Sequence, residues 1–219
     1  MHKRVVIICD GNFPKTEYPR YLIRTADFII CCDGALMKFL RNSKAIFGEA
    51  RLPDLVTGDM DTLSAAMQKK YADIIVKEDE QEHNDQTKAV RWALSNLDGI
   101  ESICILGATG GRADHTIGNI SLLMEYTRMF DLGDMSLEMV TDKETIFPIT
   151  DSTEFDCGTG RQVSIFSPDN SLRIKSEGLA FPTEDVVFDN WWKATLNKAT
   201  QDTVKLELSH PSVALVMIN

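Results

Sequence analysis

The chain has 219 residues, in which 23 basic side chains face 33 acidic ones, so the formal net charge is −10. With 43% hydrophobic and 26% charged residues, the composition is that of a globular protein that can bury a sizeable core without disulfides. The acidic balance excludes broad binding to a polyanion such as DNA by charge neutralisation, and it suits a protein that holds cations or a metal-screened anionic ligand.

The first apolar run, Val5–Cys9, stops at Asp10-Gly11 and is too short for a secretory signal or a membrane span. We therefore expect a cytoplasmic protein with no membrane partner. The five cysteines show no Cys-x-x-Cys spacing, which predicts reduced, mostly buried thiols rather than disulfides or a zinc site.

Up to about residue 140, short apolar runs alternate with amphipathic stretches, the pattern of β-α-β units around a largely parallel, Rossmann-like sheet. The predicted strands are Val5–Cys9, Phe28–Cys32, Leu55–Thr57, Ile74–Val76 and Ser102–Leu106, and the predicted helices are Leu63–Tyr71, Asp85–Leu97 and Asp114–Phe130. Several strands run directly into an aspartate or a glycine. Because ligands bind beyond the carboxyl ends of such strands, we expect a site at that edge.

After Met135 the hydrophobic period changes from 3.6 to 2, which predicts a second, all-β domain. Its expected strands are Ser136–Val140, Thr145–Ile149, Gln162–Phe166, Leu172–Ser176, Val186–Phe188, Ala194–Asn197, Thr203–Leu208 and Val213–Ile218. The predicted boundary lies between residues 133 and 134, near Gly133, so that the domains span 1–133 and 134–219.

The strongest local motif is Gly58-Asp59-Met60-Asp61-Thr62, at the end of a short strand. Two carboxylates two residues apart can point into one concavity if Gly58 lets the backbone turn, and Mg²⁺ would then offset their repulsion. The alternative, favoured about three to one for an isolated Asp-x-Asp because such turn residues are common, is a plain turn in which Asp59 caps the helix that begins at Leu63 and Asp61 faces water.

Three further motifs fall at predicted strand-to-helix junctions. Their presence favours a functional site over a plain turn. Asp33-Gly34 adds a carboxylate, and Thr87-Lys88 would place a hydroxyl, a cation and free N–H groups in the first turn of a helix, which suits a phosphate. Gly107-Ala108-Thr109-Gly110-Gly111-Arg112 can form an anion-binding nest, although it is not a P-loop. The alternatives are a surface lysine at Lys88 and a flexible glycine loop capped by Asp114.

In this order, the motifs resemble those of the thiamine pyrophosphokinase family. The matching stretches are Cys32-Asp33-Gly34-Ala35, residues 53–62, residues 81–88 and residues 106–115, with weaker likeness at Gly178-Leu179, Thr195-Leu196-Asn197 and His210-Pro211. The resemblance implies transfer of pyrophosphate from ATP to the hydroxyethyl group of thiamine, giving thiamine diphosphate and AMP. It further implies an α/β catalytic domain that binds ATP and Mg²⁺, a C-terminal β-sandwich that binds thiamine and dimerises, and a homodimer.

The resemblance also implies residue roles. Asp33, Asp59, Asp61 and Asp85 would form the catalytic acidic cluster, with Asp59, Asp61 and Asp85 as metal ligands. The nucleotide and its phosphates would contact Thr87, Lys88, Gly110, Gly111, Arg112 and Asp114. Thiamine would contact Gln81, Thr195 and Asn197. The chain departs from the family pattern at Met60, where an aromatic residue is usual, and at Leu196, where serine often stands.

Two other readings of the acidic cluster stay open. One is a metal-dependent phosphohydrolase or nucleotidyl transferase that uses the same aspartates on another acceptor. The other is a regulator that binds a nucleotide or thiamine without turning it over.

Overall fold

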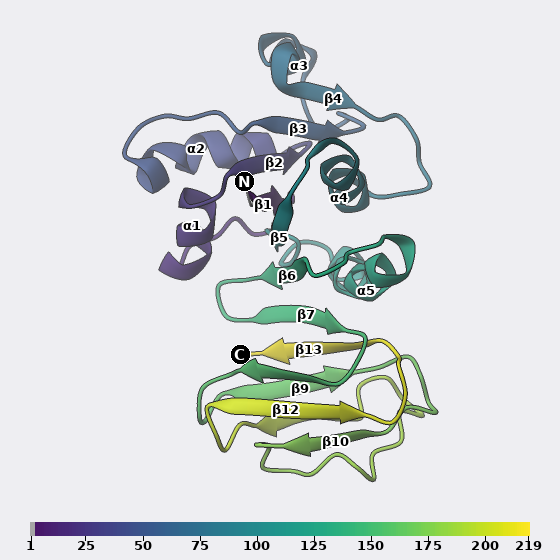
Figure 1. The fold of residues 1–219 in the computed structure, drawn as a ribbon. Coiled ribbons are helices and arrows are strands. Elements are labelled where there is room, and N and C mark those ends of the chain that lie inside the picture. Colours follow the sequence, from purple (N-terminus) through teal and green to yellow (C-terminus); the bar gives the residue numbers. More distant parts are fainter. Residues whose placement is uncertain (1–2) are drawn as a thin grey trace. The chain divides into compact units, whose positions relative to one another are not determined.

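The computed structural model describes residues 3–219, which form two compact units (Figure 1). The first unit comprises the described residues up to Leu122 together with Leu132–Asp142, and the second comprises Leu123–Asp131 and Lys143–Asn219. Within residues 3–219, no helix combines the length and the apolar character that crossing a bilayer requires.

The first unit is built on a parallel sheet with the strand order β6-β5-β1-β2-β3-β4. The strands are β1 (Lys3–Ile8), β2 (Phe28–Cys32), β3 (Leu55–Gly58), β4 (Ile75–Lys77), β5 (Ile100–Leu106) and β6 (Ser136–Val140). The chain runs outward from β1 to β4 and then crosses to β5 on the other side of β1. This order places the topological switch point between β1 and β5, where α/β folds bind their ligands.

The helices that join these strands are α1 (Glu17–Arg24), α2 (Ala35–Phe47), α3 (Ala65–Lys70), α4 (Asp85–Asn96) and α5 (Ala113–Met129), with one 3₁₀ turn, η1 (Ala72–Ile74). The structure confirms the helices predicted over 85–97 and 114–130. The helix predicted from Leu63 begins only at Ala65, because the Ser64 hydroxyl caps it by accepting the Met67 amide. Helices α1 and α2 were not predicted from the sequence.

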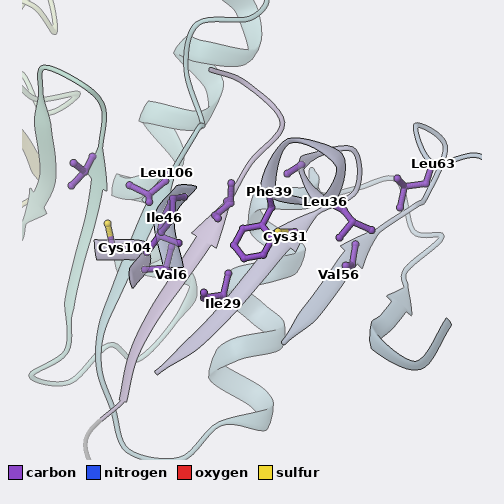
Figure 2. Close-up of a cluster of buried hydrophobic side chains, with 14 of the residues drawn as sticks. Val6, Ile29, Cys31, Leu36, Phe39, Ile46, Val56, Leu63, Cys104 and Leu106 are labelled. Carbon is purple, nitrogen blue, oxygen red and sulfur yellow. The ribbon is translucent and has the colours of Figure 1, made fainter. Parts of the chain in front are cut away.

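The core of the first unit lies between α2 and the sheet. Figure 2 shows Phe39 of α2 close to Cys31 and Leu36, with Ile29 of β2 nearby, and all four side chains are buried. All five cysteines are free and buried, as the sequence predicts.

The second unit contains two antiparallel sheets that share one core. The first has the order β11-β9-β13-β7 and the second the order β10-β12-β8. The strands are β7 (Thr145–Ile149), β8 (Thr153–Asp156), β9 (Gln162–Phe166), β10 (Ile174–Glu177), β11 (Ala194–Lys198), β12 (Thr203–Leu208) and β13 (Ala214–Ile218). Ile165 and Val216 from one sheet belong to the same buried cluster as Val204 and Leu206 from the other, which makes this unit a β-sandwich.

The predicted fold class, an α/β domain followed by a β-sandwich, is therefore confirmed. The strand predicted at Val186–Phe188 is wrong: these residues follow a turn in which the Val186 amide bonds to Thr183. Phe188 is buried in the core without joining a sheet, so the apolar character of this triplet reflects burial of a loop side chain and not a strand. The boundary at 133/134 stays a prediction, and β6, which follows it, pairs with β5 in the first unit.

Candidate functional site

A cavity of about 660 Å³ lies in the first unit, beyond the carboxyl ends of its strands. Every loop that follows β1 to β5 contributes to its wall. Its polar lining includes Asp10, Asp33, Asp59, Asp61, Thr62, Gln81, Glu82, His83, Asn84, Asp85, Gln86, Lys88, Gly111, Arg112, His115, Thr116 and Asn119. The sequence prediction that the polar motifs converge at one edge agrees with this geometry.

Three carboxylates gather in the cavity wall. Each of Asp33, Asp59 and Asp61 offers an oxygen, and these oxygens lie within 4.8 Å of one another. Oxygens bound to one Mg²⁺ are at most about 4.2 Å apart, since each Mg–O distance is about 2.1 Å. The spacing of the three oxygens is therefore close to the one that a single divalent cation requires.

Asp33 is nearly fully buried, with 3% of its surface exposed. Its Oδ2 accepts the Thr62 amide at 3.0 Å, whereas Oδ1 has no hydrogen-bond partner among the described residues. Burial raises the pKa of this carboxyl above its usual value, although the hydrogen bonds from Thr62 oppose the rise. A buried carboxylate oxygen without a donor fits a site that a cation completes.

The loop after β3 turns Asp59 and Asp61 to the same side. Met60 between them adopts φ 63° and is buried, so its side chain points into the core while its neighbours face the cavity. The Asp61 amide donates to Asp59 Oδ1 at 3.2 Å. Burial acts to raise the pKa of Asp59, but hydrogen bonds from Asp61 and Gln81 hold it below its usual value. Because Ser64 caps α3, the alternative in which Asp59 caps that helix is wrong.

Asp85 stands beside these three carboxylates at the start of α4. Its Oδ1 lies 3.4 Å from Nζ of Lys88, whose side chain is almost completely buried. Burial raises the pKa of Asp85; the Lys88 charge opposes this, and the Asp59 charge adds to it. Lys88 is thus a cavity-lining cation and not a surface lysine. The role of Asp85 as a metal ligand stays a prediction.

The other predicted nucleotide contacts differ in their access to the cavity. Gly111 and Arg112 line it, and Arg112 is paired with Asp114. Gly110, with φ 81°, packs so tightly on Asn12 that a Cβ would overlap its side chain. Thr87 is buried, and its hydroxyl donates to Asn84 at 3.0 Å. The roles of these residues in binding phosphate stay predictions.

Several residues of the cavity wall were not predicted from the sequence. Asp10 follows β1, and Nζ of Lys38 binds its Oδ1 at 2.7 Å and its backbone oxygen at 2.6 Å. Asn119 of α5 joins the loop after β5 to the start of α4, because it donates to Ala108 O and accepts from Asn84 and Gln86. Asp10 shares the strand-end signal of Asp33 and was open to the same argument, whereas a mid-helix asparagine carries no comparable signal.

The predicted thiamine contacts lie in different units. Gln81 lines the cavity and donates to Asp59 Oδ2 at 3.4 Å. Thr195 and Asn197 belong to β11 in the second unit. Asn197 is buried, with its Oδ1 accepting the Phe181 amide at 3.0 Å and its Nδ2 donating to Phe181 O at 2.7 Å. Leu196 before it adopts φ 61° and is 79% exposed.

Comparison with known proteins gives concordant results in sequence and in structure. Residues 19–132 match the family model described as thiamin pyrophosphokinase, catalytic domain, and residues 145–213 match the model described as thiamin pyrophosphokinase, substrate-binding domain. Thiamine pyrophosphokinase 1 of Oryza sativa subsp. japonica is 34% identical over 85 residues, which are 35% of this chain and 32% of that protein. Thiamin pyrophosphokinase 1 of Caenorhabditis elegans is 28% identical over 105 residues, 46% of this chain and 41% of that protein.

Two solved structures share the fold over nearly the whole chain. Thiamine pyrophosphokinase from Bacillus subtilis superposes with a TM-score of 0.77 at 17% identity, covering 99% of each chain. Thiamin pyrophosphokinase from Candida albicans superposes with a TM-score of 0.76 at 16% identity, covering 99% of this chain and 92% of that one. The chain spans between about a third and a half of the length of the curated relatives it matches. On the match of both domain models, the chain belongs to the thiamin pyrophosphokinase family.

Proposed function

We propose that the protein transfers the pyrophosphoryl group of ATP to the hydroxyethyl side chain of thiamine, giving thiamine diphosphate and AMP. One observation carries the proposal: four motifs far apart in the sequence meet in one cavity that combines three clustered carboxylates with the buried cation of Lys88. Family membership supports the same activity.

The chemistry divides between charge compensation and positioning. Asp33, Asp59 and Asp61 would hold a divalent cation, for which Mg²⁺ is the natural choice with oxygen ligands. When bound, Mg²⁺ neutralises charge on the phosphates and makes an acidic cavity attractive to ATP. Lys88 and Arg112 supply further positive charge toward the phosphates.

The reaction also needs a proton acceptor for the thiamine hydroxyl as that hydroxyl attacks the β-phosphorus. A carboxylate of the Asp59-x-Asp61 pair can take this proton if the hydroxyl lies within hydrogen-bond reach. Little covalent work is asked of the protein, so the rate would depend mainly on aligning the two substrates. The negative wall of the cavity would in addition favour the cationic thiazolium ring.

Further parts of the proposal concern substrates and assembly. Gln81, Thr195 and Asn197 are proposed to contact thiamine, while Thr87, Gly110, Gly111 and Asp114 are proposed to shape the nucleotide site. A homodimer, with thiamine held partly by the β-sandwich of the partner, and a cytoplasmic location stay predictions.

The direct test is to incubate the purified protein with ATP, Mg²⁺ and thiamine and to quantify products by chromatography. Equal amounts of AMP and thiamine diphosphate, formed only when thiamine is present, support the proposal. Formation of ADP or AMP without thiamine would indicate a phosphohydrolase or another transferase. Binding of ATP or thiamine without turnover would indicate a regulator. Asp61→Asn is the matched variant, because Asp61 is exposed and its loss should remove turnover while leaving the fold intact.

A further inference from the structure

The loop between β4 and α4, residues 78–84, forms one wall of the cavity. Its last four residues, Gln81, Glu82, His83 and Asn84, all line the cavity, and Gln81 donates to Asp59. The loop is strongly acidic, because Glu78, Asp79, Glu80 and Glu82 fall within five positions. Mutual repulsion would spread such a loop unless a cation held it.

Arg91 of α4 supplies that cation from outside the cavity. Its Nη2 donates to Oε2 of Glu78 at 2.5 Å and to Oε1 of Glu80 at 2.9 Å. Glu80 in turn holds the backbone of the next residues in the loop, since its Oε2 accepts the backbone amides of Glu82 at 2.9 Å and His83 at 3.1 Å. One guanidinium therefore fixes the beginning and the middle of the loop.

The environment of these pairs makes them stronger than ordinary surface ion pairs. The side chains of Arg91, Glu78 and Glu80 keep only 34%, 21% and 34% of their surface exposed, so solvent screens the charges less. Burial opposes ionisation of Glu80, but hydrogen bonds from Arg91 and from the amides of His83 and Glu82 lower its pKa to about 2. Glu80 is thus ionised throughout the neutral pH range.

We propose that Arg91 is a positioning residue, which holds the 78–84 loop so that Gln81 reaches Asp59 and the loop forms the cavity wall. Arg91 itself is not part of the cavity lining. The expected change in KM for the nucleotide rests on the proposed function. The expected changes in loop exchange and in the metal affinity of the carboxylate cluster do not depend on that function.

The test compares Arg91→Ala and Arg91→Lys with the wild type, using the full chain. The matched control is Arg24→Ala, since Arg24 pairs with Glu17 at 2.5 Å on α1 and neither residue lines the cavity. Hydrogen exchange measured by mass spectrometry reports the loop peptide, with the β1 peptide as an internal reference. Electron paramagnetic resonance titration with Mn²⁺ reports the affinity of the cluster without any turnover.

For Arg91→Ala we expect faster exchange in residues 78–84 with unchanged exchange in β1, and a Mn²⁺ dissociation constant raised about tenfold, as is typical when support of a metal ligand is lost. We also expect a higher KM for the nucleotide. Arg91→Lys should fall between Arg91→Ala and wild type, because a single ammonium replaces the guanidinium fork less well. Arg24→Ala should match the wild type in all three measurements.

Wild-type loop exchange and Mn²⁺ affinity in Arg91→Ala would overturn the proposal. So would a looser loop with unchanged Mn²⁺ affinity and kinetics, because Arg91 would then be merely structural. If Arg91→Ala does not fold, Glu80→Gln removes one of the two ion pairs, leaves Arg91 paired with Glu78, and must change the loop exchange and the Mn²⁺ affinity in the same direction. If these changes occur but no thiamine-dependent AMP forms even in the wild type, the proposed function fails while the positioning role stands.

Discussion

The carboxylate of Asp85 occupies the space that a side chain at Gly58 would need. A Cβ at residue 58 would lie 2.9 Å from Asp85 Cγ and 3.0 Å from both carboxylate oxygens, closer than such atoms approach in proteins. Gly58 also has φ 141°, a conformation that side chains disfavour. A side chain at residue 58 would therefore displace the Asp85 carboxylate from its place at the end of β3.

The first prediction follows from this contact. Gly58→Ala should push the Asp85 carboxylate away from Lys88 and reduce turnover by more than about 100-fold, because small displacements at a reacting centre carry losses of this size. The matched control is Gly48→Ala at the end of α2, where φ is 81° but a Cβ would meet nothing within 4 Å. Both variants place a side chain at a positive φ, and urea unfolding should show a loss of stability of about 1 kcal/mol in each. Equal activities in the two variants would contradict the role given to the contact.

The second prediction contrasts two aspartates of the cluster. Asp33→Asn should abolish Mn²⁺ binding and yet leave the metal-free protein at least as stable as the wild type at pH 7, since burial disfavours the Asp33 charge. Asparagine also tolerates the positive φ of 38° at this position. Asp59→Asn should abolish binding with a small loss of stability, because hydrogen bonds favour the Asp59 charge.

The stability difference between Asp33→Asn and wild type should depend on pH. A carboxyl with a raised pKa in the folded state binds more protons than in the unfolded state, so it lowers stability as pH rises from about 3.9 through its folded pKa. The gain in stability of Asp33→Asn over wild type should thus shrink as pH falls toward 4. Urea denaturation of the metal-free protein at several pH values measures this gain. A gain that grows toward low pH would refute the conclusion that folding raises the pKa of Asp33.

The sequence predicted that Asp33, Asp59 and Asp61 lie together at the cavity because they follow strands. Apolar runs ending in Asp33, Gly58-Asp59 or Gly107 indicate both a strand and the edge at which it ends, so convergence at that edge follows from topology. Asn119 could not be found in this way, since it reaches the cavity from the middle of α5 and only packing brings it there. Helix α2 was missed although Leu36, Phe39 and Ile46 recur at helical spacing.

The third prediction concerns Arg112. This side chain is 72% exposed and bonded to Asp114, which lowers the pKa of Asp114 to about 2. Arg112→Ala should therefore leave the free energy of unfolding within about 0.5 kcal/mol of wild type. If Arg112 contacts a phosphate, the KM for ATP should rise about tenfold, which steady-state kinetics with varied ATP will show. An unchanged KM would remove Arg112 from the phosphate site and leave it a surface arginine.

The fourth prediction tests a polar cluster in the second unit. Asp169 accepts hydrogen bonds from the hydroxyls of Ser171 at 2.6 Å and Ser212 at 2.7 Å and lies 3.1 Å from a ring nitrogen of His210. These bonds, led by that from Ser171, hold the pKa of Asp169 far below its usual value. The stabilisation is present above the unfolded pKa of about 3.9 and is lost as pH falls toward the folded value.

Asp169→Asn should accordingly lower the free energy of unfolding at pH 7, as measured with urea. The expected loss is about 1 kcal/mol, because the group is partly exposed, and the difference in this free energy between variant and wild type should narrow below pH 4. Glu184→Gln, at an exposed position of the same unit, serves as the control for a lost charge. A difference between Asp169→Asn and wild type that persists unchanged at pH 2.5 would show that the carboxylate charge does not carry the stabilisation.

The last prediction separates two roles for Asn197. Its predicted role is contact with thiamine, but its side chain is 5% exposed and closes a pair of hydrogen bonds with the backbone of Phe181 while its Oδ1 also accepts the Lys198 amide. Asn197→Ala should therefore lower the free energy of unfolding by about 2 kcal/mol, measured with urea. Thr195→Val, two residues earlier on β11, is the matched comparison for a direct substrate contact.

If Asn197 acts by holding the loop at Phe181, Asn197→Ala weakens both stability and thiamine binding. Asn197→Asp, which keeps the acceptor but loses the donor, should then fall between Asn197→Ala and wild type. If instead Asn197→Ala keeps wild-type stability and only raises the KM for thiamine, the asparagine contacts the substrate directly and the hydrogen bonds to Phe181 contribute little.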